Sequence, residues 1–317
     1  MDALYNAAKP RVVAIGGPTA TGKTALSVAL AKRFGGEIIS ADSMQIYQGL
    51  DVGTANVTPE EMQGVPHHLV GFLAPEQAFS VADFTTLAGK TITQLTAQGK
   101  LPLVVGGTGL YITSLLNGIG FTPEKVDPAI RQELQARLQA EGSQALYAEL
   151  AAVDPGYAAK VHPNNTPRVI RALELYRATG RKMSAEREAA RPAEKPYRSL
   201  CLCLTCRDRT LLYQRIDTRC DRMMQSGILE EAKLVYDHRD TYRTAAQAIG
   251  YKEFFPYFEQ TASLEACADK LKQASRNYAK RQLTWFRHMD GVVWLDAGAP
   301  EVQQCACRTV QEFLSKG

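Results

Sequence analysis

The stretch Gly-Pro-Thr-Ala-Thr-Gly-Lys-Thr at residues 17–24 constrains this chain more than any other segment. Its spacing, G-x4-G-K-T, is that of a loop whose glycines turn backbone N–H groups toward a phosphate, while the Lys neutralises phosphate oxygens and the Thr hydroxyl binds Mg²⁺. A short apolar run at 11–15 precedes the loop, and helical apolar spacing follows it over 23–34. The bound anion would therefore lie at a helix N-terminus, where the helix dipole favours it. The alternative is a glycine-rich turn without a ligand, which gives the terminal Lys-Thr pair no purpose.

Short apolar runs alternate with helical patterns along most of the chain. Strands are expected at residues 11–15, 37–40, 101–105, 200–204 and 292–295, and helices at 23–34, 81–98, 110–117, 210–225, 228–238, 245–258 and 264–287. This alternation predicts an α/β fold of the phosphate-loop type, with a mainly parallel sheet flanked by helices.

Strand signals stop between about residues 118 and 196, where the sequence shows helical patterns only. An Asn-Thr-Pro sequence at 165–167 fits the start of a helix over 168–179. We expect an all-helical insertion domain at 118–196 within a catalytic core made of residues 1–117 and 197–317.

The charge of the chain is unevenly distributed. The formal net charge of the 317 residues is only +4, but residues 168–198 hold nine Lys and Arg against four Glu, and residues 270–287 hold six Lys and Arg without an acid. Such runs are typical of proteins that bind a polyanion, although solvated helix faces carry similar runs.

Neither a membrane segment nor a metal centre built from cysteines is expected. The first residues lack the apolar core of a signal peptide, and no stretch reaches the ~20 apolar residues of a membrane span, so a cytoplasmic protein is expected. Cys201 and Cys203 alternate with Leu, as on a buried strand, and Cys305 and Cys307 are expected on a further helix after residue 295. No Cys and His set has zinc-like spacing.

A carboxylate follows the second predicted strand rather than the third. The apolar run 101–105 leads into Gly-Gly-Thr-Gly without the Asp that an ATPase or kinase commonly uses for Mg²⁺, whereas Asp42 follows the run 37–40. Because ligands bind at the carboxyl ends of strands in open α/β sheets, Asp42, Thr108 and the phosphate loop should converge there. The alternative role of Asp42 is that of a capping or turn residue.

Six motifs occur together and in order. They are GPTATGKT (17–24), SADSMQIYQGLDVGTAN (40–56), LVVGGTGLY (103–111), HPNNTPRVIRALELY (162–176), AIGYKE (248–253) and AKRQLTWFR (279–287). As a set, spanning residues 11–295, they resemble the bacterial tRNA isopentenyltransferase (tRNA dimethylallyltransferase) family.

The resemblance implies an activity and its partners. Such an enzyme transfers the dimethylallyl group of dimethylallyl diphosphate to the exocyclic N6 amine of the adenosine 3′ of the anticodon in tRNA, and it releases pyrophosphate. The implied cofactor is Mg²⁺, and the implied partners are the anticodon stem-loop of tRNA and the prenyl diphosphate, bound by a monomer.

The resemblance also assigns roles to residues near the phosphate loop. Asp42 matches the family's general base, Thr19 is a second catalytic candidate, and Arg219 is the first choice for a pyrophosphate contact, with Arg215 as the second. Thr24 would bind Mg²⁺. The expected diphosphate-binding residues are Gly17, Pro18, Thr19, Ala20, Thr21, Gly22, Lys23 and Thr24.

A second set of residues is expected to contact tRNA. It comprises Asp42, Ser43, Met44, Gln45, Thr108, Pro167, Arg168, Val169, Ile170, Arg171, Lys252, Lys280, Arg281 and Arg287. Pro167 departs from the Gln or Arg that is usual in the family, and its side chain has no hydrogen-bond donor. Trp285 on the last basic helix fits core packing as well as base stacking.

Two other functions share some of these features. A free adenine-nucleotide isopentenyltransferase would use the same loop and the same early Asp, but a mononucleotide needs no helical insertion or extended basic surface. A phosphate-loop kinase or NTPase is disfavoured by the missing strand-end Asp.

Overall fold

The protein is described by a computed structural model that covers residues 9–121, 127–190, 192 and 194–316. It forms two compact units. One contains the described residues up to Leu116 and from Lys195 onward, and the other contains those between Asn117 and Glu194.

The first unit is built on a six-stranded sheet. The strands are β1 (Arg11–Gly16), β2 (Gly36–Ser40), β3 (His67–His68), β4 (Leu101–Val105), β5 (Arg198–Thr205) and β6 (Val292–Asp296), in the order β3-β2-β4-β1-β5-β6. Every pairing of these strands is parallel. The predicted phosphate-loop-type α/β fold is confirmed, and only the two-residue strand β3 had no sequence signal.

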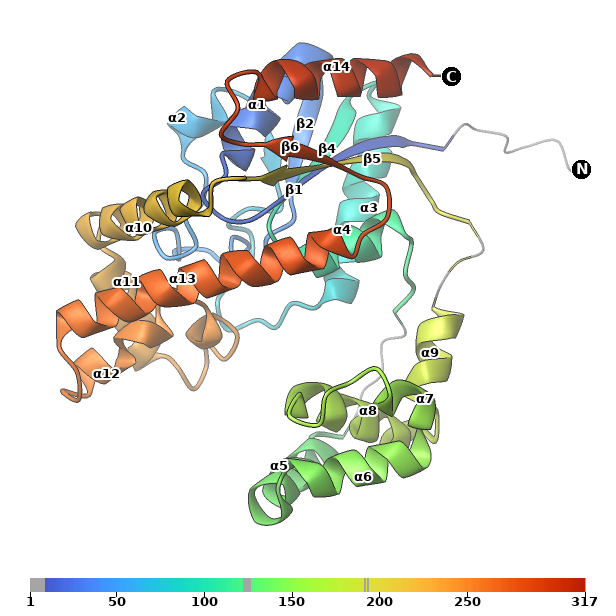
Figure 1. Cartoon of the computed structure of the whole chain (residues 1–317), viewed down its shortest axis with the longest axis vertical. Coiled ribbons are helices and arrows are strands. Elements are labelled where there is room, and N and C mark those ends of the chain that lie inside the picture. Colours follow the sequence, from blue (N-terminus) through green and yellow to red (C-terminus); the bar gives the residue numbers. More distant parts are fainter. Residues whose placement is uncertain (1–8, 122–126, 191, 193, 317) are drawn as a thin grey trace, which may run out of the picture. The chain divides into compact units, whose positions relative to one another are not determined.

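Helices cover both faces of the sheet because its strands are apolar on both sides. Val13 and Ile15 face α1 (Lys23–Phe34) and α14 (Val302–Ser315), while Val12 and Ala14 face α3 (Val81–Ala97), α4 (Gly109–Leu116) and Phe286. Figure 1 shows this layering around the sheet of the first unit. Phe286 belongs to α13 (Leu264–Arg287), which reaches the sheet with its last turns. Cys201 and Cys203 are buried on β5, as predicted.

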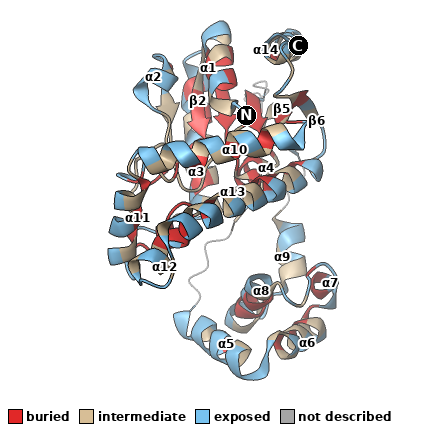
Figure 2. Cartoon of the chain, turned by 60° about the vertical axis from the view of Figure 1, so that its left-hand side comes forward, coloured by how far each residue is buried: buried red, intermediate tan, exposed pale blue. Residues whose placement is uncertain are grey.

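A third apolar cluster lies beside the carboxyl ends of the strands. The helices α10 (Arg209–Gln225) and α11 (Ile228–Asp237) pack there against α13, and the short helix α2 (Pro59–Met62) contacts α1. In Figure 2 the buried side of α13 is turned inward and its outer side is exposed.

The prediction of one helix over residues 245–258 is wrong. The structure has short 3₁₀ turns at Ala245–Gln247 and Lys252–Phe254 and a single-turn helix, α12, at Phe255–Phe258. Gly250 interrupts the helix with a φ angle of 114°. Its backbone lies against Gly53, so only a glycine fits there.

Glu231 on α11 connects the segment around Gly250 with the loop at residues 51–53. Its carboxylate accepts N–H bonds from Asp51, Val52 and Gly53 at 2.8–2.9 Å and the hydroxyl of Tyr251 at 2.5 Å. The loop that follows the Asp42 segment is therefore held in place by residues nearly two hundred positions away.

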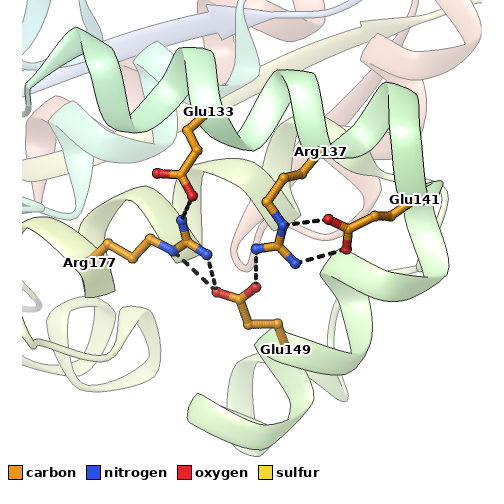
Figure 3. A network of polar contacts seen from close by, with 5 residues as sticks. All are labelled: Glu133, Arg137, Glu141, Glu149 and Arg177. Carbon is orange, nitrogen blue, oxygen red and sulfur yellow. Dashed lines mark hydrogen bonds and ion pairs between the residues drawn. The ribbon is translucent and has the colours of Figure 1, made fainter.

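The second unit is helical throughout its described residues. It contains α5 (Pro128–Glu141), α6 (Ser143–Val153), α7 (Pro155–Ala158), α8 (Thr166–Thr179) and α9 (Met183–Ala189) around one apolar core. Glu149 on α6 accepts from Arg137 of α5 at 2.6 Å and from Arg177 of α8 at 2.8 Å (Figure 3). The three helices are thus joined by shared ion pairs as well as by packing.

Candidate active site

The phosphate loop leads from β1 into α1 as the sequence predicts. Gly17 has a φ angle of 134°, and a Cβ atom there would lie 2.5 Å from the carbonyl oxygen of Leu204. Gly22 caps α1 with a φ angle of 82°, and the cap is made without a side-chain hydrogen bond. The first turn of α1 contains no acidic residue, so no side chain of that turn competes with an anion for its free N–H groups.

Two side chains brace the loop from inside. The hydroxyl of Thr21 donates to the carbonyl of Pro18 at 2.8 Å, and the ammonium of Lys23 donates to the same oxygen at 2.7 Å. Because Pro18 is buried, the two donors that bond to its carbonyl point into the interior of the loop.

Lys23 and Arg219 form a pair of partly buried cations. Burial lowers the pKa of Lys23 to about 8, and repulsion by Arg219 adds to the effect, while Asp42 opposes it. Burial also lowers the pKa of Arg219, again with Asp42 acting in the opposite direction. The positive charges of Lys23 and Arg219 thus exceed the single negative charge of Asp42 that acts on both, a balance that suits a further anion.

Asp42 lies at the carboxyl end of β2, where the chain turns rather than entering a helix. One carboxylate oxygen accepts the N–H of Met44 at 2.9 Å, so Asp42 also serves as a turn residue. Thr108 joins this segment to the end of β4: its N–H donates to Ala41 at 3.2 Å, and its hydroxyl accepts from the N–H of Ser43 at 3.2 Å. Asp42 and Thr108 are therefore held at one edge of the sheet.

The amide of Gln45 is engaged within the chain. Its oxygen accepts from the hydroxyl of Ser40 at 3.1 Å, and its nitrogen donates to the carbonyl of Ala55 at 2.9 Å. Gln45 thereby links the Asp42 segment to the loop that Glu231 holds. Its expected contact with an adenosine stays a prediction.

The two arginines of α10 have different surroundings. Arg219 acts on Lys23 and Asp42, whereas a guanidinium nitrogen of Arg215 donates to the carbonyl of Ala297 at 3.3 Å. Arg219 stays the first choice for the pyrophosphate contact and Arg215 the second, and both remain predictions.

Sequence reasoning missed two residues of α13 that lie at this site. Burial raises the pKa of Tyr278 to about 12, and the neighbouring Asp42 contributes to the increase. Gln282 is buried and hydrogen-bonds both to Thr19 of the phosphate loop and to Gly107. The one sequence signal that could have indicated Gln282 is its position inside the basic motif AKRQLTWFR (279–287).

Trp285 packs in the fold rather than offering its ring to a base. Its indole N–H donates to the hydroxyl of Thr113 at 3.0 Å, and the ring covers the backbone of Gly109, where a side chain would overlap it. Of the two interpretations, core packing is the one that the structure supports.

Within the second unit, the expected tRNA-contact stretch is divided between core and surface. Pro167 and Arg168 are exposed at the start of α8, whereas the side chains of Val169 and Ile170 are buried in the apolar core. Arg171 is exposed but pairs with Glu174 at 2.9 Å. A contact by Val169 or Ile170 would therefore have to use the backbone.

The remaining basic candidates are exposed. Lys280, Arg281 and Arg287 lie on the outer side of α13, and Lys252 donates to the carbonyl of Gln247 at 2.8 Å. Among the residues that the structure describes, no group of three or more His, Cys, Asp or Glu side chains could hold a metal ion, and no helix is long and apolar enough to cross a membrane.

Pyrophosphate binding should weaken as the pH rises through the pKa of Lys23. Below pH 8 the free lysine is already charged, whereas above about pH 8 it must take up a proton when the anion binds. The affinity is therefore expected to fall by up to ~10-fold per pH unit above that point. Calorimetric titration with magnesium pyrophosphate from pH 7 to 9.5 measures this slope. In Lys23→Arg the cation stays charged, so a slope equal to that of the unaltered protein would contradict the prediction.

The fold and the loop together define a phosphate-loop α/β protein with a candidate anion site at the carboxyl ends of its strands. The model of the IPP transferase family matches residues 45–289, and that of the isopentenyl transferase family matches residues 10–70. The chain belongs to the IPP transferase family, which confirms the resemblance seen in its motifs.

Individual relatives match over nearly the whole chain. The tRNA dimethylallyltransferase of Bacillus subtilis is 50% identical over 295 residues, 93% of each protein, and that of Geobacillus thermodenitrificans is 48% identical over 291 residues, 92% of each. Among solved structures, a tRNA isopentenylpyrophosphate transferase from Bacillus halodurans has a TM-score of 0.72 at 44% identity and covers 97% of this chain and 98% of its own. A eukaryotic dimethylallyltransferase acting on tRNA has a TM-score of 0.81 at 31% identity, over 96% of this chain and 79% of its own.

Proposed function

We propose that this protein transfers the dimethylallyl group from dimethylallyl diphosphate to the exocyclic N6 amine of the adenosine 3′ of the anticodon in tRNA, with release of pyrophosphate. The observation that supports this most is the convergence of Lys23, Arg219 and Asp42 beside the phosphate loop. Two cations suit a diphosphate that gains charge as it leaves, and the carboxylate suits an amine that must lose a proton. The names of the relatives support the same substrates.

The reaction requires one bond to form and one to break. The N6 nitrogen attacks the first carbon of the prenyl chain, and the electron pair of the carbon–oxygen bond passes to the departing diphosphate. Lys23 and Arg219 stabilise the charge that develops on the diphosphate oxygen. Asp42 accepts the N6 proton. The hydrogen bond from the N–H of Met44 to one carboxylate oxygen fixes the orientation of the Asp42 side chain.

Magnesium is the proposed cofactor. The hydroxyl of Thr24, at the start of α1, is an oxygen donor of the kind that Mg²⁺ prefers, and phosphate oxygens complete such sites. When bound, the ion would neutralise part of the diphosphate charge. Thr24 would hold it, and Thr19 would offer its hydroxyl to the same anion.

The tRNA must present an unstacked adenosine to this site. A single-stranded anticodon loop makes base flipping inexpensive, at a few kcal/mol or less. The flipped base would lie against Asp42, Ser43, Met44, Gln45 and Thr108, and hydrogen bonds within the protein that hold this segment support the proposal. We assign contacts with the rest of the anticodon stem-loop to the helical insertion of residues 118–196, with Arg168 exposed, and to Lys252, Lys280, Arg281 and Arg287. We further propose that the protein acts as a monomer in the cytoplasm.

A labelled-transfer assay tests the function directly. Purified protein with Mg²⁺ and dimethylallyl diphosphate carrying a labelled prenyl group should transfer label to unmodified tRNA with adenosine 3′ of the anticodon. A tRNA with guanosine at that position serves as the matched control and should stay unlabelled. Transfer to free AMP alone would indicate a nucleotide isopentenyltransferase, and consumption of ATP without transfer would indicate a phosphate-loop kinase or NTPase.

The tRNA affinity should fall steeply with salt, and Lys280→Ala should reduce that dependence. The ammonium of Lys280 is exposed and lies 5.9 Å from the ring centre of Tyr213, at the outer face of α13. Loss of one phosphate contact should make the slope of log affinity against log salt shallower by about 0.7–0.9. The control is Lys100→Ala, which removes another exposed charge just before the amino end of β4, whereas the candidate site lies at the carboxyl ends of the strands. It should leave the slope unchanged. Equal slopes in all three proteins would remove Lys280 from the phosphate contacts.

A further inference from the structure

Gln282 connects two loops of the site with the two ends of one amide group. Its side-chain oxygen accepts the N–H of Thr19 in the phosphate loop at 2.9 Å. Its side-chain nitrogen donates to the carbonyl of Gly107, after β4, at 3.0 Å. The side chain is only 5% exposed, so these bonds do not compete with bulk water. A neutral amide is the side chain that offers a donor and an acceptor at this reach.

The side-chain nitrogen of Gln282 lies close against Gly107. A Cβ atom at position 107 would overlap the side-chain nitrogen of Gln282, while its next neighbours, Cδ of Gln282 and the carbonyl of Gly17, are 3.2 and 3.7 Å away. The φ angle of Gly107 lies outside the left-handed region that favours glycine. A side chain at position 107 would therefore displace the amide of Gln282, whereas the backbone conformation would accept it.

The loop on the far side of Gln282 is tied to the base-binding side of the site. The N–H of Gly106 donates to Ile15 at 3.1 Å, and Thr108 bonds to both Ala41 and Ser43, the residues on either side of Asp42. Hydrogen bonds therefore connect Thr19 through Gln282 to Gly107, and the next residue along the chain, Thr108, is hydrogen-bonded to the Asp42 turn.

We propose that Gln282 is a positioning residue that fixes the spacing between the diphosphate-binding loop and the Asp42 turn. This role rests on the proposed function. In that function the diphosphate-binding loop holds the prenyl donor and the Asp42 turn holds the attacking amine, and the two must meet. Because the Thr19 N–H is directed at Gln282, the loop is ordered by the protein itself. A displacement of about 1 Å between the two halves is enough to cost ~10²-fold in rate.

A double-mutant cycle between Gln282→Ala and Gly107→Ala tests the role. Gln282→Ala removes both bonds, and Gly107→Ala forces Gln282 out of place. Each single variant should lower the single-turnover rate of label transfer, with both substrates saturating, by about 10- to 100-fold. The double variant should be no slower than Gln282→Ala, because the added methyl group then meets no side chain. The dissociation constants of tRNA and of pyrophosphate should change by less than about threefold.

Several measurements separate positioning from folding. Melting temperatures of all variants are compared with that of Thr284→Ala, an exposed position of α13 whose hydroxyl bonds to its own helix and which should keep the unaltered rate. If Gln282→Ala does not fold, Gln282→Glu replaces it. Gln282→Glu keeps an acceptor for Thr19 but loses the donor to Gly107, and it too should lose at least tenfold in rate.

Three results of the double-mutant cycle would contradict the proposed positioning role of Gln282. They are single variants with an unaltered rate, rate losses that multiply in the double variant, or losses confined to substrate affinity. If the unaltered protein transfers no label at all, the proposed function fails instead, so the two failures are distinguishable.

Discussion

Asp42→Asn is expected to lower the rate of prenyl transfer by about 10²–10⁴-fold, while the affinity for tRNA changes little. An asparagine keeps the oxygen that accepts the Met44 N–H, so the turn after β2 is preserved. It cannot accept the proton that the attacking amine must lose. Single-turnover transfer and tRNA binding, both measured at pH 7, where Lys23 is mainly charged, give the two quantities.

The matched comparison is Asp42→Ala, which removes the turn hydrogen bond as well. Should Asp42→Asn retain the unaltered rate while Asp42→Ala loses it, Asp42 would be a turn residue and not the base. Loss of tRNA binding with an unaltered rate at saturation would lead to the same conclusion. Both results separate the two roles that the sequence leaves open for this side chain.

Arg219→Gln is expected to reduce kcat by about 10²–10³-fold, the range measured when one charge-stabilising donor is removed from an active site. Arg219 also depresses the pKa of Lys23, so its removal should move the alkaline loss of pyrophosphate affinity to higher pH. A purely structural role would not produce that shift. The measurements are kcat at pH 7 and pyrophosphate affinity between pH 7 and 9.5.

Arg222→Gln is the control, since Arg222 lies exposed on the same helix and belongs to no part of the site. It should leave both kcat and the pH profile unaltered. An Arg219→Gln protein with unaltered kcat would remove Arg219 from the leaving-group contacts. An unaltered pH profile would remove it from the surroundings of Lys23.

The local parts of the fold could be predicted from the sequence because their signals are local. The helix at 23–34 has the predicted bounds, with Gly22 before it and Gly35 after it, both in the left-handed region. The parallel sheet followed from apolar runs that match five of the six strands within two residues at each end, namely β1, β2, β4, β5 and β6. The helix predicted over 245–258 failed because Gly250 turns toward Gly53, a contact that no local pattern contains.

The candidate site could be predicted only in part for the same reason. Lys23, Asp42 and Thr108 follow strands, and strand ends meet at one edge of a parallel sheet. Gln282 reaches that edge from a helix, and its bond to Thr19 spans 263 positions, so neither spacing nor periodicity marks it. Val169 and Ile170 show the opposite case, since their motif suggested contact while their periodicity places them in a core.

The bond between Thr19 and Gln282 also has a consequence for biosynthesis. The ribosome adds Gln282 to the chain 263 residues after Thr19 of the phosphate loop. A nascent chain therefore holds one half of the proposed site long before the other exists, and prematurely terminated translation products that lack α13 cannot join them.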